Sequence, residues 1–159
     1  MTRLLAVYLS DHHAGSAAGV ALARRAARSN AQLPDGRVLT DVAREIAEDR
    51  QVLERVMDAL EIRPSRVKVA LARATEMAGR LKLNGRIVHR SPLSAMLELE
   101  ALSLGILGKR KLWQALDGVP GVAATAGVDF AALAERARAQ HEIVETSRRH
   151  AAQTALRQA

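Results

Sequence analysis

The sequence predicts an all-α protein, an antiparallel bundle of about five helices that forms one domain over residues 1–159. The chain contains 31 alanines and 21 leucines, which are strong helix formers, but only three of the aromatic residues that strands favour. Its four prolines lie at expected helix boundaries, and the apolar residues between them recur at helical spacing. Because the chain contains no cysteine, disulfides, iron–sulfur clusters and thiol nucleophiles are excluded.

The first two helices are predicted over residues 3–28 and 39–61. The first ends before the turn Pro34-Asp35-Gly36, and its small residues, such as Gly15 and Gly19, predict close approach of a neighbouring helix. The second begins with Thr40 or Asp41 as its N-cap, because a short polar side chain can accept a hydrogen bond from the free N–H groups of the first turn.

Three further helices follow. The third starts after Pro64-Ser65 and reaches about residue 83, where Asn84-Gly85 is a C-cap signal. The fourth has Ser91 as N-cap and proline at its first position, and it continues to about residue 116. Residues 118–127 are predicted to be a loop, after which Asp129 caps a last helix that ends near residue 156.

The fourth predicted helix is apolar on nearly all sides, which is typical of a helix at the centre of a bundle or covered by a partner chain. We therefore expect a homodimer. Gly105 and Gly108 within this helix predict close helix packing. The segment from Leu104 to Lys109 lacks the spacing of a phosphate-binding loop, and the chain has no G-x-S-x-G and no His-Glu-x-x-His, which argues against an enzyme.

Ionisable residues lie within or beside the apolar stripes of four predicted helices. They are Asp11, Glu45, Asp49, Glu100, His141 and Glu145. Removing the partner of a buried carboxylate costs about 3–5 kcal/mol, so these groups must be paired, metal-bound, protonated or less buried than the stripes indicate. A polar layer of salt bridges is one interpretation, with Arg44, Arg50 and Arg148 as the partners.

The segments YLSDHHAGSAAG, REIAEDRQVL, LELEALSLGILGK and AQHEIVE resemble a bacterial group within the ferritin-like superfamily of helical bundles. The resemblance implies a carboxylate-rich metal centre, with Asp11 as the ligand of the first helix and Glu100 as that of a later one. Metal-binding members carry Glu-x-x-His on two helices. This chain has Glu45-Ile46-Ala47-Glu48 and Glu142-Ile143-Val144-Glu145 instead.

From the resemblance and this departure from its motif, we predict a protein with a structural or interaction role. Its di-metal site is expected to be degraded, and no cofactor is expected. The alternative is a metal-binding protein with iron or manganese on the six residues named above. His12 and His13 are not expected to chelate one ion together, because adjacent residues point about 100° apart on a helix. They are interpreted as surface or capping residues.

The whole net charge of +7 lies within residues 61–116. Basic residues line both edges of the third predicted helix: Arg66, Lys68, Arg73, Arg80, Lys82 and Arg86. This anion-binding candidate suits nucleic acid, an anionic membrane surface or an acidic partner, and a solvated face is the simpler interpretation. The apolar run near the N-terminus is too short for a signal peptide, and no run is long enough to span a membrane, so a cytoplasmic protein is expected.

Overall fold

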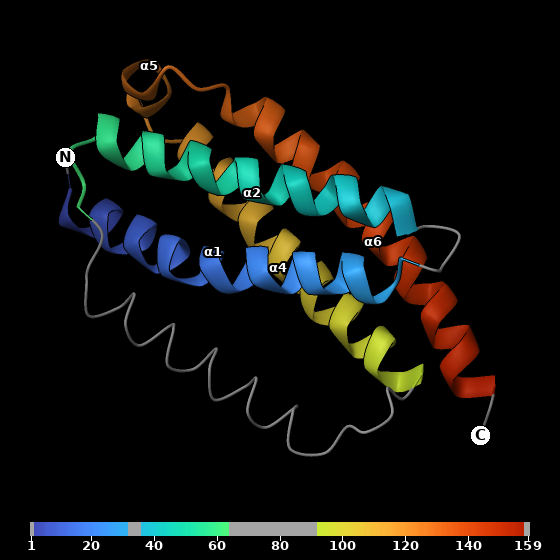
Figure 1. Ribbon diagram of the computed structural model, residues 1–159. Coiled ribbons are helices and arrows are strands. Elements are labelled where there is room, and N and C mark those ends of the chain that lie inside the picture. Colours follow the sequence, from blue (N-terminus) through green and yellow to red (C-terminus); the bar gives the residue numbers. More distant parts are fainter. Residues whose placement is uncertain (1, 32–35, 64–91, 158–159) are drawn as a thin grey trace.

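The computed structural model describes residues 2–31, 36–63 and 92–157. Within these ranges the chain is helical and contains no strand. Its helices are α1 (Arg3–Ser29), α2 (Gly36–Ala59), α4 (Pro92–Asp117), α5 (Val122–Ala126) and α6 (Phe130–Arg157) (Figure 1). The prediction of an all-α protein is therefore confirmed for the described part of the chain.

The four long helices form a bundle of two helical hairpins (Figure 1). The helices α1 and α2 pair along their length, as do α4 and α6, and the two hairpins meet through contacts of α1 with α4 and of α2 with α6. Neighbouring helices are antiparallel, whereas α2 and α4 run in the same direction. The end of α2 and the start of α4 consequently lie at opposite ends of the bundle (Figure 1).

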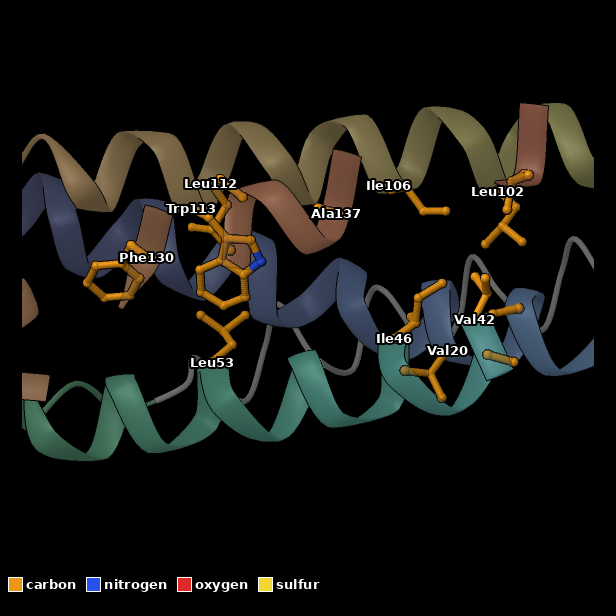
Figure 2. Packing of buried hydrophobic residues seen from close by; sticks show 14 of the residues in the cluster. Val20, Val42, Ile46, Leu53, Leu102, Ile106, Leu112, Trp113, Phe130 and Ala137 are labelled. Atoms are coloured by element: carbon orange, nitrogen blue, oxygen red, sulfur yellow. The ribbon is translucent and has the colours of Figure 1, made fainter. Parts of the chain in front are cut away.

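The core of the bundle contains the single tryptophan and the single phenylalanine of the chain. Trp113 of α4 stacks on Phe130 of α6, with ring centroids 6.1 Å apart and an angle of 17° between the rings. Leu53 of α2 points toward the tryptophan ring from the opposite helix (Figure 2). A buried aromatic pair contributes about 0.5–1.5 kcal/mol beyond the area that it buries, so this contact ties the start of α6 to the end of α4.

Local signals predicted several helix boundaries correctly. The helix α4 begins at a proline, whose missing N–H is not needed in a first turn. The carboxylate of Asp129 accepts a hydrogen bond from the N–H of Ala132 at 2.9 Å, which confirms the predicted cap of α6. Four of the five predicted helices are present, and the one predicted to start after Ser65 and to reach about residue 83 lies outside the described residues.

Two boundary predictions were wrong. The helix α2 begins at Gly36 rather than near Leu39, so Thr40 lies inside its first turns and donates to the carbonyl of Gly36 at 3.2 Å instead of capping the helix. The predicted loop over residues 118–127 contains α5. Gly121 and Gly127 flank this short helix with φ of 80° and 61°, values that glycine adopts without a steric penalty.

The C-terminal end of α2 is closed by a Schellman motif. The N–H of Ile62 donates to the carbonyl of Met57 at 2.8 Å, and the N–H of Glu61 donates to that of Asp58 at 2.9 Å. Ile62 and Met57 are both buried, as this motif favours. Glu61 occupies the left-handed position, with φ of 55°, where glycine is the usual residue.

The surface of α4 is partly apolar. Leu99, Leu102 and Ile106 are buried, whereas Leu93, Leu97 and Leu104 are 44%, 51% and 64% exposed. None of the helices in the described ranges has both the length and the apolar character needed to cross a lipid bilayer.

Candidate functional site

A buried carboxylate lies at the centre of the bundle. Asp49 of α2 is only 1% exposed. The ammonium of Lys109 on α4 forms an ion pair with its Oδ2, and the guanidinium of Arg136 on α6 forms one with its Oδ1. Both oxygens of Asp49 therefore have cationic partners, each from a different helix.

Gln140 joins this pair of contacts to a second carboxylate. Its side chain is also 1% exposed and lies one turn after Arg136. The amide oxygen accepts from Nζ of Lys109, and the amide nitrogen donates to Oε2 of Glu45 at 2.8 Å and to Oδ2 of Asp49 at 3.4 Å. We call Glu45, Asp49, Lys109, Arg136 and Gln140 the ion-pair layer. Its two acidic and two basic residues are balanced in formal charge.

The ammonium of Lys109 is strongly desolvated in this layer. Burial lowers the pKa of Lys109, and the nearby charge of Arg136 acts in the same direction, while the contact with Asp49 works against both. The carboxylate of Asp49 and the amide oxygen of Gln140 thus replace the water that would otherwise solvate the ammonium of Lys109. Removing one partner of a buried ion pair is strongly destabilising and typically costs about 3–5 kcal/mol.

A second polar group connects α4 to α6. The hydroxyl of Ser103 donates to Oε1 of Glu145 at 2.7 Å, and Nε of Arg148 donates to the same carboxylate at 3.0 Å. The hydrogen bond from Arg148 is the main reason that the pKa of Glu145 lies below its ordinary value, although burial acts in the opposite direction. The predicted pairing of Arg148 with a stripe carboxylate is therefore confirmed.

A third group connects α1 to α2 and corrects the interpretation of His13. This residue is buried rather than at the surface, and its Nε2 lies 3.3 Å from Oε1 of Glu54, which also accepts from Nε of Arg50 at 3.0 Å. Burial alone would raise the pKa of Glu54, but the hydrogen bonds from Arg50 and His13 bring it below the ordinary value. Since Arg50 pairs with Glu54, and Arg44 with Glu48, neither is the partner of Asp49.

The predicted metal ligands are only partly brought together. Asp49 and Glu45 share the amide of Gln140, and Glu145 lies in its own group with Ser103 and Arg148. Asp11 is exposed on α1, Glu100 is exposed on α4, and His141 is half-buried on α6. Among the residues that the structure describes, no three histidine, aspartate or glutamate side chains lie close enough to hold a metal ion.

Sequence reasoning missed the residues that surround Asp49. Lys109 is the first of three consecutive basic residues that follow an apolar run, and Arg136 and Gln140 are four residues apart beside Ala137 of the apolar stripe. Residues that are four positions apart lie on the same side of a helix. The sequence therefore indicated that Arg136 and Gln140 share a helix face. The six basic residues of the anion-binding candidate, Arg66, Lys68, Arg73, Arg80, Lys82 and Arg86, lie outside the described residues.

A cavity of about 370 Å³ adjoins the ion-pair layer between α1, α2 and α4. Leucine and isoleucine side chains form much of its wall, and Asp49 and Lys109 contribute polar atoms. Four helical glycines line it: Gly15, Gly19, Gly105 and Gly108. A Cβ added to any of them would meet no atom of the described neighbouring residues within 4 Å, so none of the described helices packs closely against these glycines.

The candidate site therefore has two adjoining parts, the charge-balanced ion-pair layer and the mainly apolar cavity, which share Asp49 and Lys109. Comparison of the chain with protein-family models, with curated proteins and with solved structures finds no match.

Proposed function

We propose that the protein is a ferritin-like bundle with a structural or interaction role, in which the ion-pair layer replaces a di-metal centre. The direction of the helices supports the kinship. The helices α1 and α6 run one way and α2 and α4 run the other, so the end of α2 and the start of α4 lie at opposite ends of the bundle (Figure 1). One long crossover is the connectivity of ferritin-like bundles.

The observation that carries the proposal is the pairing of Asp49 with both Lys109 and Arg136. A divalent cation on this carboxylate would have to approach an ammonium and a guanidinium that are already in contact with it. It would also leave the ammonium of Lys109, whose side chain is only 14% exposed, without its carboxylate partner, at a cost of several kcal/mol. Glu45, the neighbouring acidic residue, is held by the amide of Gln140.

Metal analysis tests this proposal. The protein is purified without chelator, incubated with Fe(II), Mn(II) or Zn(II), desalted and measured by elemental analysis. We expect no metal in stoichiometric amount. Retention of one or two ions per chain, released by both Glu45→Gln and Glu100→Ala in folded protein, would overturn the proposal and establish the metal-binding alternative.

We further propose that a second copy of the chain packs on α4. Leu93, Leu97 and Leu104 support this, because their spacing places them along one line of the helix and all three are exposed. Light scattering is expected to give twice 17.2 kDa for the wild type and 17.2 kDa for Leu97→Glu combined with Leu104→Glu. Ala139→Glu, at an exposed position of α6, is the matched control and should leave the mass unchanged.

A further inference from the structure

The wall of the cavity between α1, α2 and α4 contains a buried hydrogen-bond donor that has no acceptor in the described part of the chain. Trp113 lines the cavity and is 0% exposed, and its Nε1 has no hydrogen-bond partner among the described residues. The ring nitrogen lies on the edge that faces Ile46 and Ile106 rather than on the side of Phe130 (Figure 2). A buried tryptophan N–H usually finds an acceptor, so this donor indicates that an acceptor is supplied from within the cavity.

The four glycines of the wall are a second, independent observation. A glycine inside a helix destabilises it by about 0.5–1 kcal/mol relative to alanine. Such a loss is often offset by the close approach of another backbone, but a Cβ at Gly15, Gly19, Gly105 or Gly108 would meet no atom of the described neighbours within 4 Å. The effect of these glycines is to leave space, because larger side chains at the same positions would occupy the cavity.

We propose that this cavity binds a small, electrically neutral organic molecule with an apolar body and one hydrogen-bond acceptor, which accepts from Nε1 of Trp113. Leu22, Leu53, Leu102 and Ile106 supply an apolar surface for the body of the ligand. The volume of about 370 Å³ lies within the range of roughly 300–1,000 Å³ that is common for pockets of small organic ligands.

The charges around the cavity favour a neutral ligand. Lys109 is paired with Asp49, and Arg50 with Glu54, so the cations of the wall already have anionic partners. Asp11 adds a further carboxylate to the lining. A ligand carboxylate would therefore lose its hydration without gaining an unpaired cation, which is unfavourable, whereas a carbonyl oxygen needs only one donor.

Calorimetric titration with three probes of similar size tests the proposal: acetophenone (neutral, with an acceptor), ethylbenzene (neutral, without one) and benzoate (anionic). We expect acetophenone to bind to one site per chain, ethylbenzene to bind roughly five- to tenfold more weakly for lack of the hydrogen bond, and benzoate to bind more weakly than acetophenone. In Trp113→Phe the affinity for acetophenone should fall to that for ethylbenzene, while the affinity for ethylbenzene stays the same.

Cavity-filling variants locate the binding. Gly105→Leu and Gly108→Leu should each abolish binding of both neutral probes while keeping the helical circular dichroism of the wild type. Ala115→Leu, an exposed position on the same helix, should bind as the wild type does. The proposal is overturned if the wild type binds neither neutral probe, if benzoate binds most tightly, if the two neutral probes bind equally well, or if folded Gly105→Leu and Gly108→Leu bind undiminished.

Discussion

The carboxylate of Asp49 on α2 and the ammonium of Lys109 on α4 are in contact across the bundle, although they lie 60 residues apart in the sequence. Asp49 is almost completely buried and the side chain of Lys109 is only 14% exposed. The helix that carries each group is positioned by its apolar face, and the ion pair forms because the two faces meet in this register. Arg136 and Gln140 then complete the contacts from α6.

Lys109→Met should lower the free energy of unfolding by about 3–5 kcal/mol, because the buried carboxyl group of Asp49 would have one cationic partner fewer. Urea denaturation followed by circular dichroism measures the change. Lys111→Met removes the same charge from an exposed position two residues later on the same helix and should change the stability by less than about 0.5 kcal/mol. Equal effects of the two variants would show that the buried pair is not important for stability.

Two glycine-to-alanine substitutions should have opposite effects. A Cβ at Gly36 would lie 2.5 Å from the carbonyl oxygen of Ala31, so Gly36→Ala should destabilise the protein by roughly 1–3 kcal/mol. A Cβ at Gly105 would meet no atom of the described residues within 4 Å, so Gly105→Ala should stabilise the protein by about 0.5–1 kcal/mol through helix propensity. Thermal unfolding of the two variants measures both changes, and a loss of stability in Gly105→Ala would contradict the open space seen there.

Glu61→Gly should raise the melting temperature. The left-handed conformation of Glu61, with φ of 55°, costs a residue with a Cβ about 1 kcal/mol, and glycine avoids this penalty. Arg55→Gly, at an exposed position inside α2, is the control and should lower the stability by about 1 kcal/mol. If both substitutions lowered the melting temperature, the conformation assigned to Glu61 would be wrong.

The Glu145 carboxylate should contribute to acid unfolding. Its pKa in the folded protein lies below the ordinary value of 4.5, so its charged form stabilises the fold above that pH. This contribution is lost as the pH falls through the lowered pKa. Between about pH 5 and about pH 3, the free energy of unfolding should therefore fall less steeply in Glu145→Gln than in the wild type. Asp58→Asn, at an exposed position, serves as the control, and a slope for Glu145→Gln equal to that of the wild type would refute this role.

Much of the fold was predictable because its signals are local. Proline at the start of α4 and Asp129 before α6 act on N–H groups within one turn, so sequence alone placed these two boundaries correctly. The start of α2 was misplaced because Gly36 lies against the backbone of Ala31, a contact that no periodicity reports. The short helix α5 was missed since its two flanking glycines predict a turn equally well.

The candidate site was less predictable because its contacts join residues that are far apart in the sequence. The apolar spacing around Asp49 correctly indicated that this carboxylate is buried, but its nearest basic neighbour in sequence, Arg50, points to Glu54. His13 was predicted to lie at the surface because its partner, Glu54, is 41 residues later, and the residues near His13 do not indicate that the two side chains meet. Which charges meet depends on how far one helix is shifted along another, and that shift follows from the packing of all the helices together.

The amino-acid sequence by itself determined the helices, their apolar faces and the presence of charged groups within those faces, because each depends on residues a few positions apart. Only the tertiary structure decided that Lys109, Arg136 and Gln140 surround Asp49 and that Trp113 and four glycines line a cavity beside them. The physical reason is that a buried charge takes whichever partner the packed helices bring within reach, and helix packing is set by the shapes of whole faces rather than by neighbours in the chain.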